Sequence, residues 1–408
     1  MNRDELQEKY ASYLLDEGNL IAAWATSTGK SLIAIKALDR LYDRNPEFKA
    51  LLVVAETEHK NNWRKEFMKF LGEEKTNTLL SNITVICYAS LKNYRNTEWD
   101  VLICDEGHHI MSDLRISILR TMKAKRVLIL SATLNKDTVR TLESLFGRFN
   151  ITKVSLQKSI DNRYVPKPTI HCIALELDNK NPTETVEYNW GKKGRILADW
   201  SERFKFLKEK NRFKGYTIVF RCTQREKYDH ICEEYNYWKN IYMHNPGNIG
   251  IKNRWLQLGS QRKRYLGELK TKLVKPLIDS LREKNARFLC FCTSIKQAEK
   301  LGGSSAISSR NSKSFQVIED FNMKRIDELF AVGMLTEGVS LTDIQVGVII
   351  QLDGNERLFL QKFGRSLRAE NPEQYIFYFK DTRDVEYLNK ALKDINPKYV
   401  KYDRHSYQ

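Results

Sequence analysis

Residues 19–31 read NLIAAWATSTGKS and decide the fold. The apolar start of this stretch predicts a buried strand, the turn Gly29-Lys30-Ser31 ends it, and helical apolar spacing follows over 31–42. This is the context of a phosphate-binding P-loop. Its backbone N–H groups would hold phosphates, Lys30 would reach the terminal ones, and the Ser31 hydroxyl would bind Mg²⁺. The residues expected to contact a nucleotide here are Thr26, Ser27, Thr28, Gly29, Lys30 and Ser31.

Short runs rich in Val, Ile and Leu alternate with helical patterns along the rest of the chain. Their near-continuous hydrophobicity is typical of parallel strands, so we predict doubly wound α/β sheets. Early strands, including that of the P-loop, are expected at 19–25, 50–55, 83–88, 100–104 and 126–131, with further helices at 59–71 and 136–147. Late strands are expected at 287–293, 328–333, 345–351 and 374–379, with helices at 295–302, 355–368 and 383–393.

These patterns divide the chain into two α/β units with a different region between them. We predict an ATP-binding unit over 1–165, a linker and accessory lobe over 166–275, and a second α/β unit over 276–408. Pro166 and Pro168 mark the hinge. The lobe is rich in Lys, Arg, Trp and Tyr and is mainly helical by pattern.

The charge of the chain is concentrated in that lobe. Lys and Arg number 68 against 51 Asp and Glu, a net charge of +17. Residues 191–287 hold 24 basic and 10 acidic residues, a net of +14, which leaves +3 for the rest of the chain. A basic block confined to one region indicates a polyanion partner.

Several classes of protein are excluded or disfavoured. The seven cysteines form no C-x-x-C pair, which argues against a disulfide framework and a zinc site. No apolar run is long enough for a membrane span, and the first residues are too polar for a secretory signal. We therefore expect no membrane partner and a cytoplasmic protein, in the host cytoplasm if a phage encodes it.

Two carboxylates follow the apolar run at 100–104. Asp105 would hold Mg²⁺, and Glu106 would orient and deprotonate the attacking water. An acidic strand end facing solvent is the alternative, but a P-loop on the same sheet argues against it. Small hydroxyl residues end the next strand, where Ser131 and Thr133 could relay changes at Glu106 and the phosphates to a bound polymer.

A third motif lies near the end of the chain. Gln361, Arg365 and Arg368 fall on one helical face at i, i+4 and i+7. Arginines that come from outside a P-loop domain can stabilise the transition state of phosphoryl transfer. We predict that these three side chains reach the same phosphates from the second α/β unit.

In this order the motifs resemble those of the superfamily 2 helicases and translocases, and residues 105–108 match the DExH form. Residues 30–109 resemble type I and III restriction motor subunits, T-even phage branch-migration helicases and xeroderma-type repair helicases. The resemblance covers 1–165 and about 280–385. It implies two tandem RecA-like domains, with ATP and Mg²⁺ in the cleft between them and nucleic acid across the top.

The resemblance also assigns individual residues. Gln7 would read adenine, His108 would bridge the two domains, and Glu337 and Gly338 belong to a nucleotide-sensing motif of the second domain. Motifs at 51–67, 83–91 and 291–294 would touch nucleic acid. Their expected contacts are Trp63, Lys65, Ser90 and Thr293.

The chain departs from the usual motifs at four positions. Ser27 replaces a glycine, Glu56 a proline, and Gly107 an alanine or cysteine, while Ser340 replaces an acidic or amide residue. We expect Ser27 to be tolerated if its backbone φ is negative.

Two interpretations of the basic lobe stay open. Its basic residues could contact phosphates, which makes binding strongly salt-dependent, and its aromatic residues could stack on bases. Alternatively the aromatic residues form a core beneath a solvated basic surface. The phosphate contacts that we predict are Arg254, Arg262, Lys263 and Arg264.

The leading hypothesis is an ATP-dependent helicase or translocase that acts on DNA rather than RNA, in repair, recombination or replication. The alternatives are an RNA helicase or remodeller, and a nucleic-acid-binding scaffold with a decayed ATPase. A motor subunit that depends on another chain for targeting or processivity also stays open. We expect a monomer.

Overall fold

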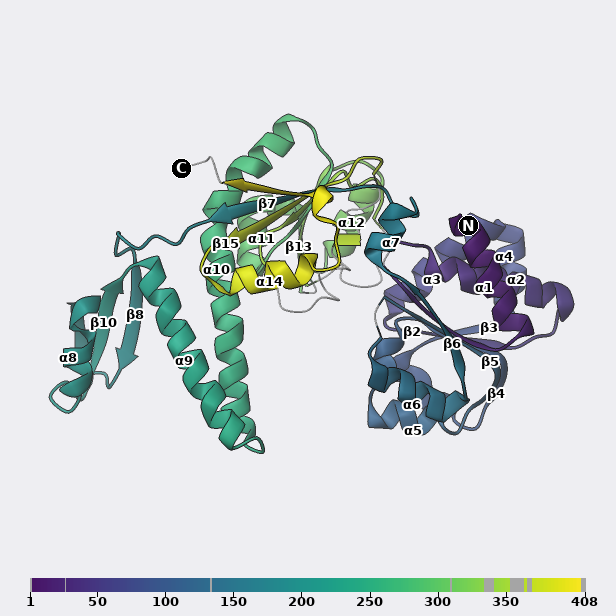
Figure 1. The fold of residues 1–408 in the computed structure, drawn as a ribbon, viewed down its shortest axis with the longest axis horizontal. Helices are drawn as coiled ribbons and strands as arrows, with labels where there is room; N and C mark the ends of the chain where they lie inside the picture. The colour runs from purple at the N-terminus through teal and green to yellow at the C-terminus, as the bar shows by residue number, and fades with distance from the viewer. Residues whose placement is uncertain are drawn as a thin grey trace.

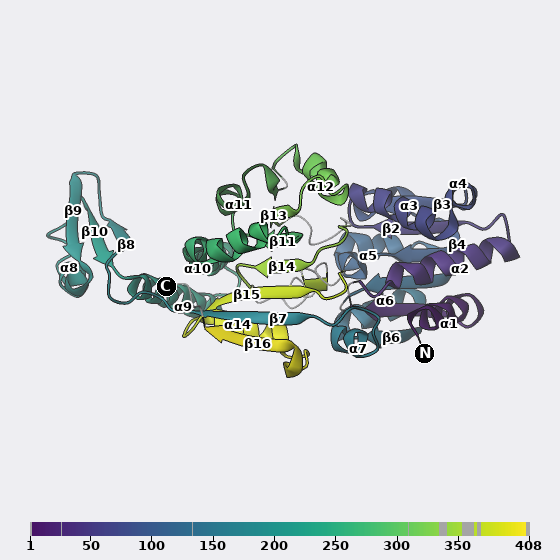
Figure 2. The ribbon, with the colours of Figure 1, turned by 90° about the horizontal axis from the view of Figure 1, so that it is seen from above.

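The computed structural model describes residues 2–404 except 26, 133, 309, 334–340, 353–362 and 365–368. Two α/β units lie side by side, and a narrow lobe extends from the second unit on the side away from the first (Figures 1 and 2). Among the described residues, no helix is both long and apolar enough to cross a membrane.

The first unit is a six-stranded parallel sheet in the order β3-β2-β4-β5-β1-β6. Every residue of β2 is buried, as the continuous apolar pattern predicts. Helices cover both faces, with α1 to α4 on one and α5 and α6 on the other (Figure 1). The strands are β1 (Asn19–Trp24), β2 (Ala50–Val54), β3 (Ile83–Cys87), β4 (Glu98–Cys104), β5 (Lys123–Ser131) and β6 (Phe149–Val154). The helices are α1 (Arg3–Asp16), α2 (Lys30–Arg44), α3 (Thr57–Leu71), α4 (Glu73–Leu80), α5 (Asp113–Leu119) and α6 (Lys136–Phe146), with 3-10 turns η1 (Tyr88–Tyr94) and η2 (Gly107–Ile110).

The second unit is a seven-stranded parallel sheet in the order β12-β13-β11-β14-β15-β7-β16. Helix α7 (Leu156–Asp161) leads into it and packs in its core with α12 and α14, while α10 and α11 pack on the other face. The strands are β7 (Thr169–Leu175), β11 (Phe288–Phe291), β12 (Ala306–Ser308), β13 (Glu328–Val332), β14 (Val346–Ile349), β15 (Glu373–Phe379) and β16 (Val400–Arg404). The helices are α10 (Ile249–Glu283), α11 (Ile295–Gly302), α12 (Ser314–Asn322) and α14 (Arg383–Leu392), with 3-10 turns η4 (Gly303–Ser305) and η5 (Pro397–Tyr399).

The predicted α/β architecture is confirmed, with one difference at the hinge. Strand β7 lies in the range 166–275, which the sequence assigned to linker and lobe, yet it pairs with β15 and β16 inside the second sheet. The residues of β7 alternate between buried and half-buried, so this strand is a weaker sequence signal than the continuous apolar runs of other strands. The second sheet therefore takes a strand from the segment that directly follows the first unit.

The lobe combines a small sheet with a helix hairpin. Strand β10 (Tyr216–Cys222) lies between β8 (Glu184–Asn189), which is antiparallel to it, and β9 (Gly194–Asp199), which is parallel. The 3-10 turn η3 (Trp200–Glu202) and helix α8 (Arg203–Lys208) follow β9. Helix α9 (Gln224–His244) then runs back against α10, and their joined ends project away from the second sheet (Figure 1). The lobe is mainly helical as predicted, but its three-stranded sheet was not expected.

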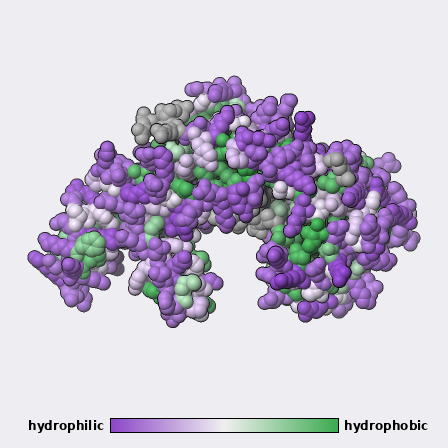
Figure 3. Space-filling model, viewed as in Figure 1, coloured by the Kyte–Doolittle hydropathy of each residue, from purple (hydrophilic) through white to green (hydrophobic). Residues whose placement is uncertain are grey.

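The aromatic residues of the lobe support the packing interpretation. Trp190 and Trp200 pack around the small core of Phe220 and Ile218. Trp255 stacks on Tyr242, with 5.3 Å between the ring centroids. Each of these tryptophan rings is half-buried and packs against another ring or against the small core, and the surrounding surface of the lobe is mainly hydrophilic (Figure 3).

Candidate functional site

A cavity of about 710 Å³ opens where strands β1 and β4 end. Most of its lining comes from the first unit, from the P-loop, α1, α3 and the end of β4. The segment 341–343 of the second unit completes the wall, together with Tyr164, Val165 and Pro166 from the hinge. The site is therefore shared between the two α/β units, as the sequence predicted for a split site.

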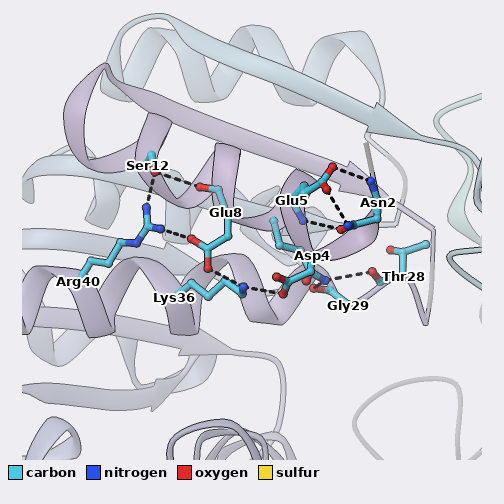
Figure 4. Close-up of polar contacts among 10 residues, drawn as sticks. Asn2, Asp4, Glu5, Glu8, Ser12, Thr28, Gly29, Lys36 and Arg40 are labelled. Atoms are coloured by element: carbon cyan, nitrogen blue, oxygen red, sulfur yellow. Dashed lines mark hydrogen bonds and ion pairs between the residues drawn. The ribbon is translucent and has the colours of Figure 1, made fainter.

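Helix α1 holds the P-loop from behind. Gln7 is buried, and its Nε2 donates to the carbonyl oxygen of Gly29 at 2.9 Å. Gly29 has a φ of 80°, and a Cβ there would lie 2.5 Å from Gln7 Nε2, so only glycine fits. Lys36 on α2 bonds Asp4 and Glu8 of α1 at 2.7 and 2.6 Å (Figure 4). Gln7, predicted to read adenine, thus also supports the P-loop backbone.

Ser27 does not have the negative φ under which we expected a serine to be tolerated at this position. Its φ is +66°, in the left-handed region that favours glycine. The Ser27 hydroxyl donates to the carbonyl oxygen of Gly364 in the second unit at 2.7 Å. The strained serine thus gains a hydrogen bond between the units that a glycine could not make.

Lys30 and Glu106 face each other across the cavity. The Lys30 Nζ lies 3.5 Å from Glu106 Oε1, and both side chains keep a small exposure, 12% and 15%. The second Glu106 oxygen lies 3.4 Å from Nδ1 of His108. Glu106 has a φ of +48°, and the chain continues directly into η2. The structure brings the P-loop lysine together with the carboxylate that was predicted to be catalytic, and His108 contacts Glu106.

Two hydrogen bonds hold the carboxylate of Asp105. Trp63 Nε1 donates to Oδ2 at 2.9 Å, and the backbone N–H of Glu106 donates to Oδ1 at 3.0 Å. Burial raises the pKa of the Asp105 carboxyl, and the neighbouring Glu106 raises it further. The charge of Lys30 and the hydrogen bond from Trp63 act in the opposite direction. Bound Mg²⁺ would favour the ionised form of Asp105, as Lys30 and Trp63 do.

The donors at this site fit Mg²⁺. Ser31 and Asp105 offer a hydroxyl and a carboxylate, and Ser31 lines the same cavity. Within the described residues no cluster of three His, Cys, Asp or Glu side chains could hold a metal alone. Magnesium in nucleotide sites takes one or two protein ligands together with waters and substrate phosphates, so this set is sufficient.

Two departures from the usual motifs have a local explanation. The backbone N–H of Glu56 donates to Nδ1 of His59 at 3.0 Å and closes the start of α3, a bond that proline could not make. A Cβ at Gly107 would lie 2.3 Å from Cγ2 of Ile129, so alanine would not fit without a shift.

Part of the predicted site lies outside the described residues. Ser131 ends β5 and is fully buried. The remaining predicted site residues, for which the structure gives no placement, are Thr26, Thr133, Glu337, Gly338, Gln361, Arg365 and Arg368.

The predicted nucleic-acid contacts divide into exposed and buried residues. Lys65 is exposed on α3, Ser90 is half-buried in η1, and Thr293 is half-buried after β11. Trp63, by contrast, is 4% exposed and faces Asp105, so the structure argues against a contact with nucleic acid. Its spacing along α3 places it on the face that packs against the sheet.

The basic residues of α10 show the same division. Arg264 is exposed, while Arg254 and Lys263 are half-buried. Arg262 is 4% exposed, and its guanidinium lies over the ring of Tyr235 at 4.3 Å. Arg262 therefore joins α10 to α9, and its burial argues against the predicted phosphate contact.

Two side chains at the cavity and one that bonds the backbone of Asp105 were not predicted in their roles. His59 and Trp63 come from α3, and the Tyr88 hydroxyl donates to the carbonyl oxygen of Asp105 at 2.9 Å. The apolar face of α3 was visible in the sequence, but its direction toward Asp105 depends on how β2 pairs with β4.

Two tandem RecA-like units with a P-loop site between them define the class of protein, and comparisons with known proteins agree. Residues 4–136 match the family model described as type III restriction enzyme, res subunit. Residues 269–370 match that of the helicase conserved C-terminal domain. The protein belongs to the superfamily 2 helicases, as its motifs suggested.

Individual relatives match shorter stretches or the fold alone. Human DNA repair and recombination protein RAD54B is 29% identical over 140 residues, which cover 27% of this chain and 15% of that protein. The chain thus spans about 15% of the length of the curated relatives it matches. Saccharomyces cerevisiae Dbp5 bound to RNA and ADP BeF3 superposes with a TM-score of 0.61 at 12% identity, over 98% of this chain and 90% of that chain. The Pyrococcus furiosus Hef helicase domain gives a TM-score of 0.49 at 14% identity, over 95% and 96%.

Proposed function

We propose that this protein hydrolyses ATP in the cleft between its two RecA-like units and uses the cycle to move along or remodel DNA. The observation that carries the proposal is the arrangement of Lys30, Asp105 and Glu106 around one cavity whose remaining wall comes from the second unit. A site built from two bodies changes when they move, so ATP turnover can be linked to motion.

Four polar side chains of the cavity have a task in this proposal. Lys30 binds the terminal phosphates, and Ser31 and Asp105 hold the Mg²⁺ that neutralises their charge. Glu106 orients the attacking water and accepts its proton. To do so it must leave Lys30, which lies 3.5 Å away and would be drawn to the phosphates instead.

The second unit contributes the switch. We assign transition-state contacts to Gln361, Arg365 and Arg368, which flank the described Gly364. The hydrogen bond from Ser27 to Gly364 supports this assignment, since it places Gly364 next to the P-loop. Closure of the cleft would add the arginines to the site, and hydrolysis would release them.

One observation favours DNA as the polymer, and a second indicates a polyanion. The relatives that match part of this chain are named as DNA repair and recombination proteins. The basic excess over 191–287 lies on the lobe and on α10, beside the hollow between the helix hairpin and the first unit (Figure 3). We propose that DNA crosses the two units and that exposed basic residues such as Arg264 add salt-dependent affinity.

The test is ATP turnover by the wild-type chain with double-stranded, single-stranded and forked DNA and with RNA. We expect stimulation that is strongest with a DNA substrate and absent in Lys30→Ala. Stimulation by RNA alone would replace DNA with RNA in the proposal. Salt-sensitive binding without turnover on any polymer would instead identify a scaffold with a decayed ATPase.

The Lys30→Ala variant needs a control that alters a charge outside the site. Glu98 lies at the opposite end of β4 from Asp105 and pairs with Lys123 at 2.6 Å on the surface. Glu98→Gln should keep the wild-type turnover and its stimulation. A loss of turnover in this control would mean that charge changes disturb the unit as a whole.

A further inference from the structure

The side chain of Asp105 is fixed from two directions. Trp63 Nε1 donates to one carboxylate oxygen at 2.9 Å, and the backbone N–H of Glu106 donates to the other at 3.0 Å. The backbone of Asp105 is fixed as well, by bonds of 2.9 Å from its N–H to Val53 and from the Tyr88 hydroxyl to its carbonyl oxygen. A carboxylate oxygen can accept two hydrogen bonds, so each oxygen keeps capacity for a further partner.

The position of Trp63 follows from the sheet. Strand β2 pairs with β4 in parallel, so α3, which begins just after β2, passes the end of β4 where Asp105 lies. The Trp63 ring is buried against Phe67, one turn along α3, with 5.9 Å between the centroids. The indole is thus held by packing, and its single donor has a fixed direction.

The acceptor distinguishes Trp63 from other tryptophans of the same unit. Trp24 donates to the hydroxyl of Thr152 at 3.2 Å, and Trp99 donates to the hydroxyl of Thr97 at 2.8 Å. Those bonds satisfy a buried donor with a neutral partner. A bond from Trp63 to an ionised carboxylate is stronger and more directional, and it constrains a group that faces the cavity.

We propose that Trp63 is a positioning residue, whose indole N–H holds Asp105 in the rotamer that presents its remaining capacity to Mg²⁺ in the cavity. The inference rests on the proposed function for the identity of the metal site. Hydrogen-bond partners behind a metal ligand typically contribute a factor of about 10–100 in metal affinity or activity.

The test compares Trp63→Phe with Trp99→Phe. Both variants keep an aromatic ring and lose one indole N–H, and Trp99 lies on β4 at the end away from Asp105. The affinity for a fluorescent ATP analogue is measured with Mg²⁺ and with EDTA. In Trp63→Phe we expect the gain in affinity due to Mg²⁺ to fall about 10-fold or more, with the EDTA value unchanged.

The Mg²⁺ concentration that half-saturates ATP turnover should rise by a similar factor in Trp63→Phe. A purely structural role would lower the amplitude of both signals without moving this concentration. Equal Mg²⁺ dependence in Trp63→Phe and Trp99→Phe would overturn the inference. If the wild-type chain binds nucleotide with Mg²⁺ but does not hydrolyse it, the proposed function fails while the affinity comparison still decides the role of Trp63.

A measurement on the unaltered protein covers the case in which Trp63→Phe does not fold. The indole ¹H–¹⁵N resonance of Trp63 should shift when Mg²⁺ is added to the nucleotide-bound protein, because Asp105 then donates a lone pair to the metal. The Trp99 resonance should stay in place. A Trp63 resonance that does not respond to Mg²⁺ would contradict the proposed contact.

Discussion

Two lysine–carboxylate pairs, one in each α/β unit, differ in how open they are to a ligand. Lys30 and Glu106 stand 3.5 Å apart at a cavity, with exposures of 12% and 15%. Lys270 and Asp384 stand 2.7 Å apart with exposures of 0% and 1%. The first pair can rearrange when a ligand enters, whereas the second is closed to ligands.

Hydrogen bonds around the second pair complete the contrast. Lys270 also donates to Gln351 at 2.8 Å and to the carbonyl oxygen of Phe377 at 2.9 Å, so all three of its protons are used. Asp384 accepts from Gln351 at 2.6 Å and from the Phe379 N–H at 3.1 Å. The same residue types therefore form a closed structural pair in the core of the second unit and a pair open to a ligand at the cavity.

The largest effect on stability is expected from breaking the closed pair. Lys270→Met leaves the Asp384 carboxylate buried without a counter-charge, which should cost about 3–5 kcal/mol of unfolding free energy. Lys30→Met should cost less than Lys270→Met, since Glu106 lines a cavity and keeps 15% exposure, yet it should abolish nucleotide binding. Denaturant unfolding and nucleotide titration measure the two effects.

Controls for the closed pair lie on the same helices. Lys275→Met removes a surface pair with Asp279, also on α10, and should change stability by no more than about 0.5 kcal/mol. Lys270→Met combined with Asp384→Leu should recover most of the loss, because both charges are then gone. Equal losses in Lys270→Met and Lys30→Met would remove the contrast between the pairs.

A smaller effect is expected at Ser27. Ser27→Ala keeps the strained backbone and loses the bond to Gly364, whereas Ser27→Gly loses the bond but relieves the strain. The glycine variant should be more stable than the alanine variant by about 1–2 kcal/mol, the cost of a left-handed conformation. Thermal unfolding of the two variants gives the difference. Equal stabilities would show that the left-handed backbone at this position carries no strain.

The smallest expected effect is a pH dependence of the lobe. Burial among Tyr188 and Trp200 lowers the pKa of His230. The charge of Arg203 lowers this pKa further, whereas Glu234 and Glu233 raise it. The unfolded chain therefore binds this proton at higher pH than the folded chain does. Stability should fall as the pH drops from about 6.5 toward the lower pKa of the folded protein.

His230→Gln separates this contribution from other acid-sensitive groups. The variant cannot take up the proton, so its unfolding free energy should change less between pH 7.5 and 5.5 than that of the wild type. Identical slopes in the two proteins would show that His230 is not the group responsible.

The sequence predicted those parts of the fold and site that local patterns specify. The P-loop, the carboxylates after β4 and the central strands follow from continuous apolar runs and from the residues at their ends. The partly polar β7 and β16 lack such runs. Their position in the sheet depends on pairing with strands far along the chain.

Contacts between distant segments were not predictable. Trp63 and Asp105 are separated by 42 positions, and Lys270 and Asp384 by 114. Neither pair has a sequence signal, because each depends on how helices pack on a completed sheet. The same reason explains why Trp63 and Arg262 were expected at a nucleic-acid surface.

In the proposed mechanism, the cavity hydrolyses ATP with Glu106 as the base. DNA-stimulated ATP turnover by the wild type and by Glu106→Gln, with ATP binding measured in parallel, tests this role. We expect that the variant binds ATP but loses about 10²–10⁴-fold in turnover. Turnover at the wild-type rate in Glu106→Gln would contradict the role of Glu106 as the base.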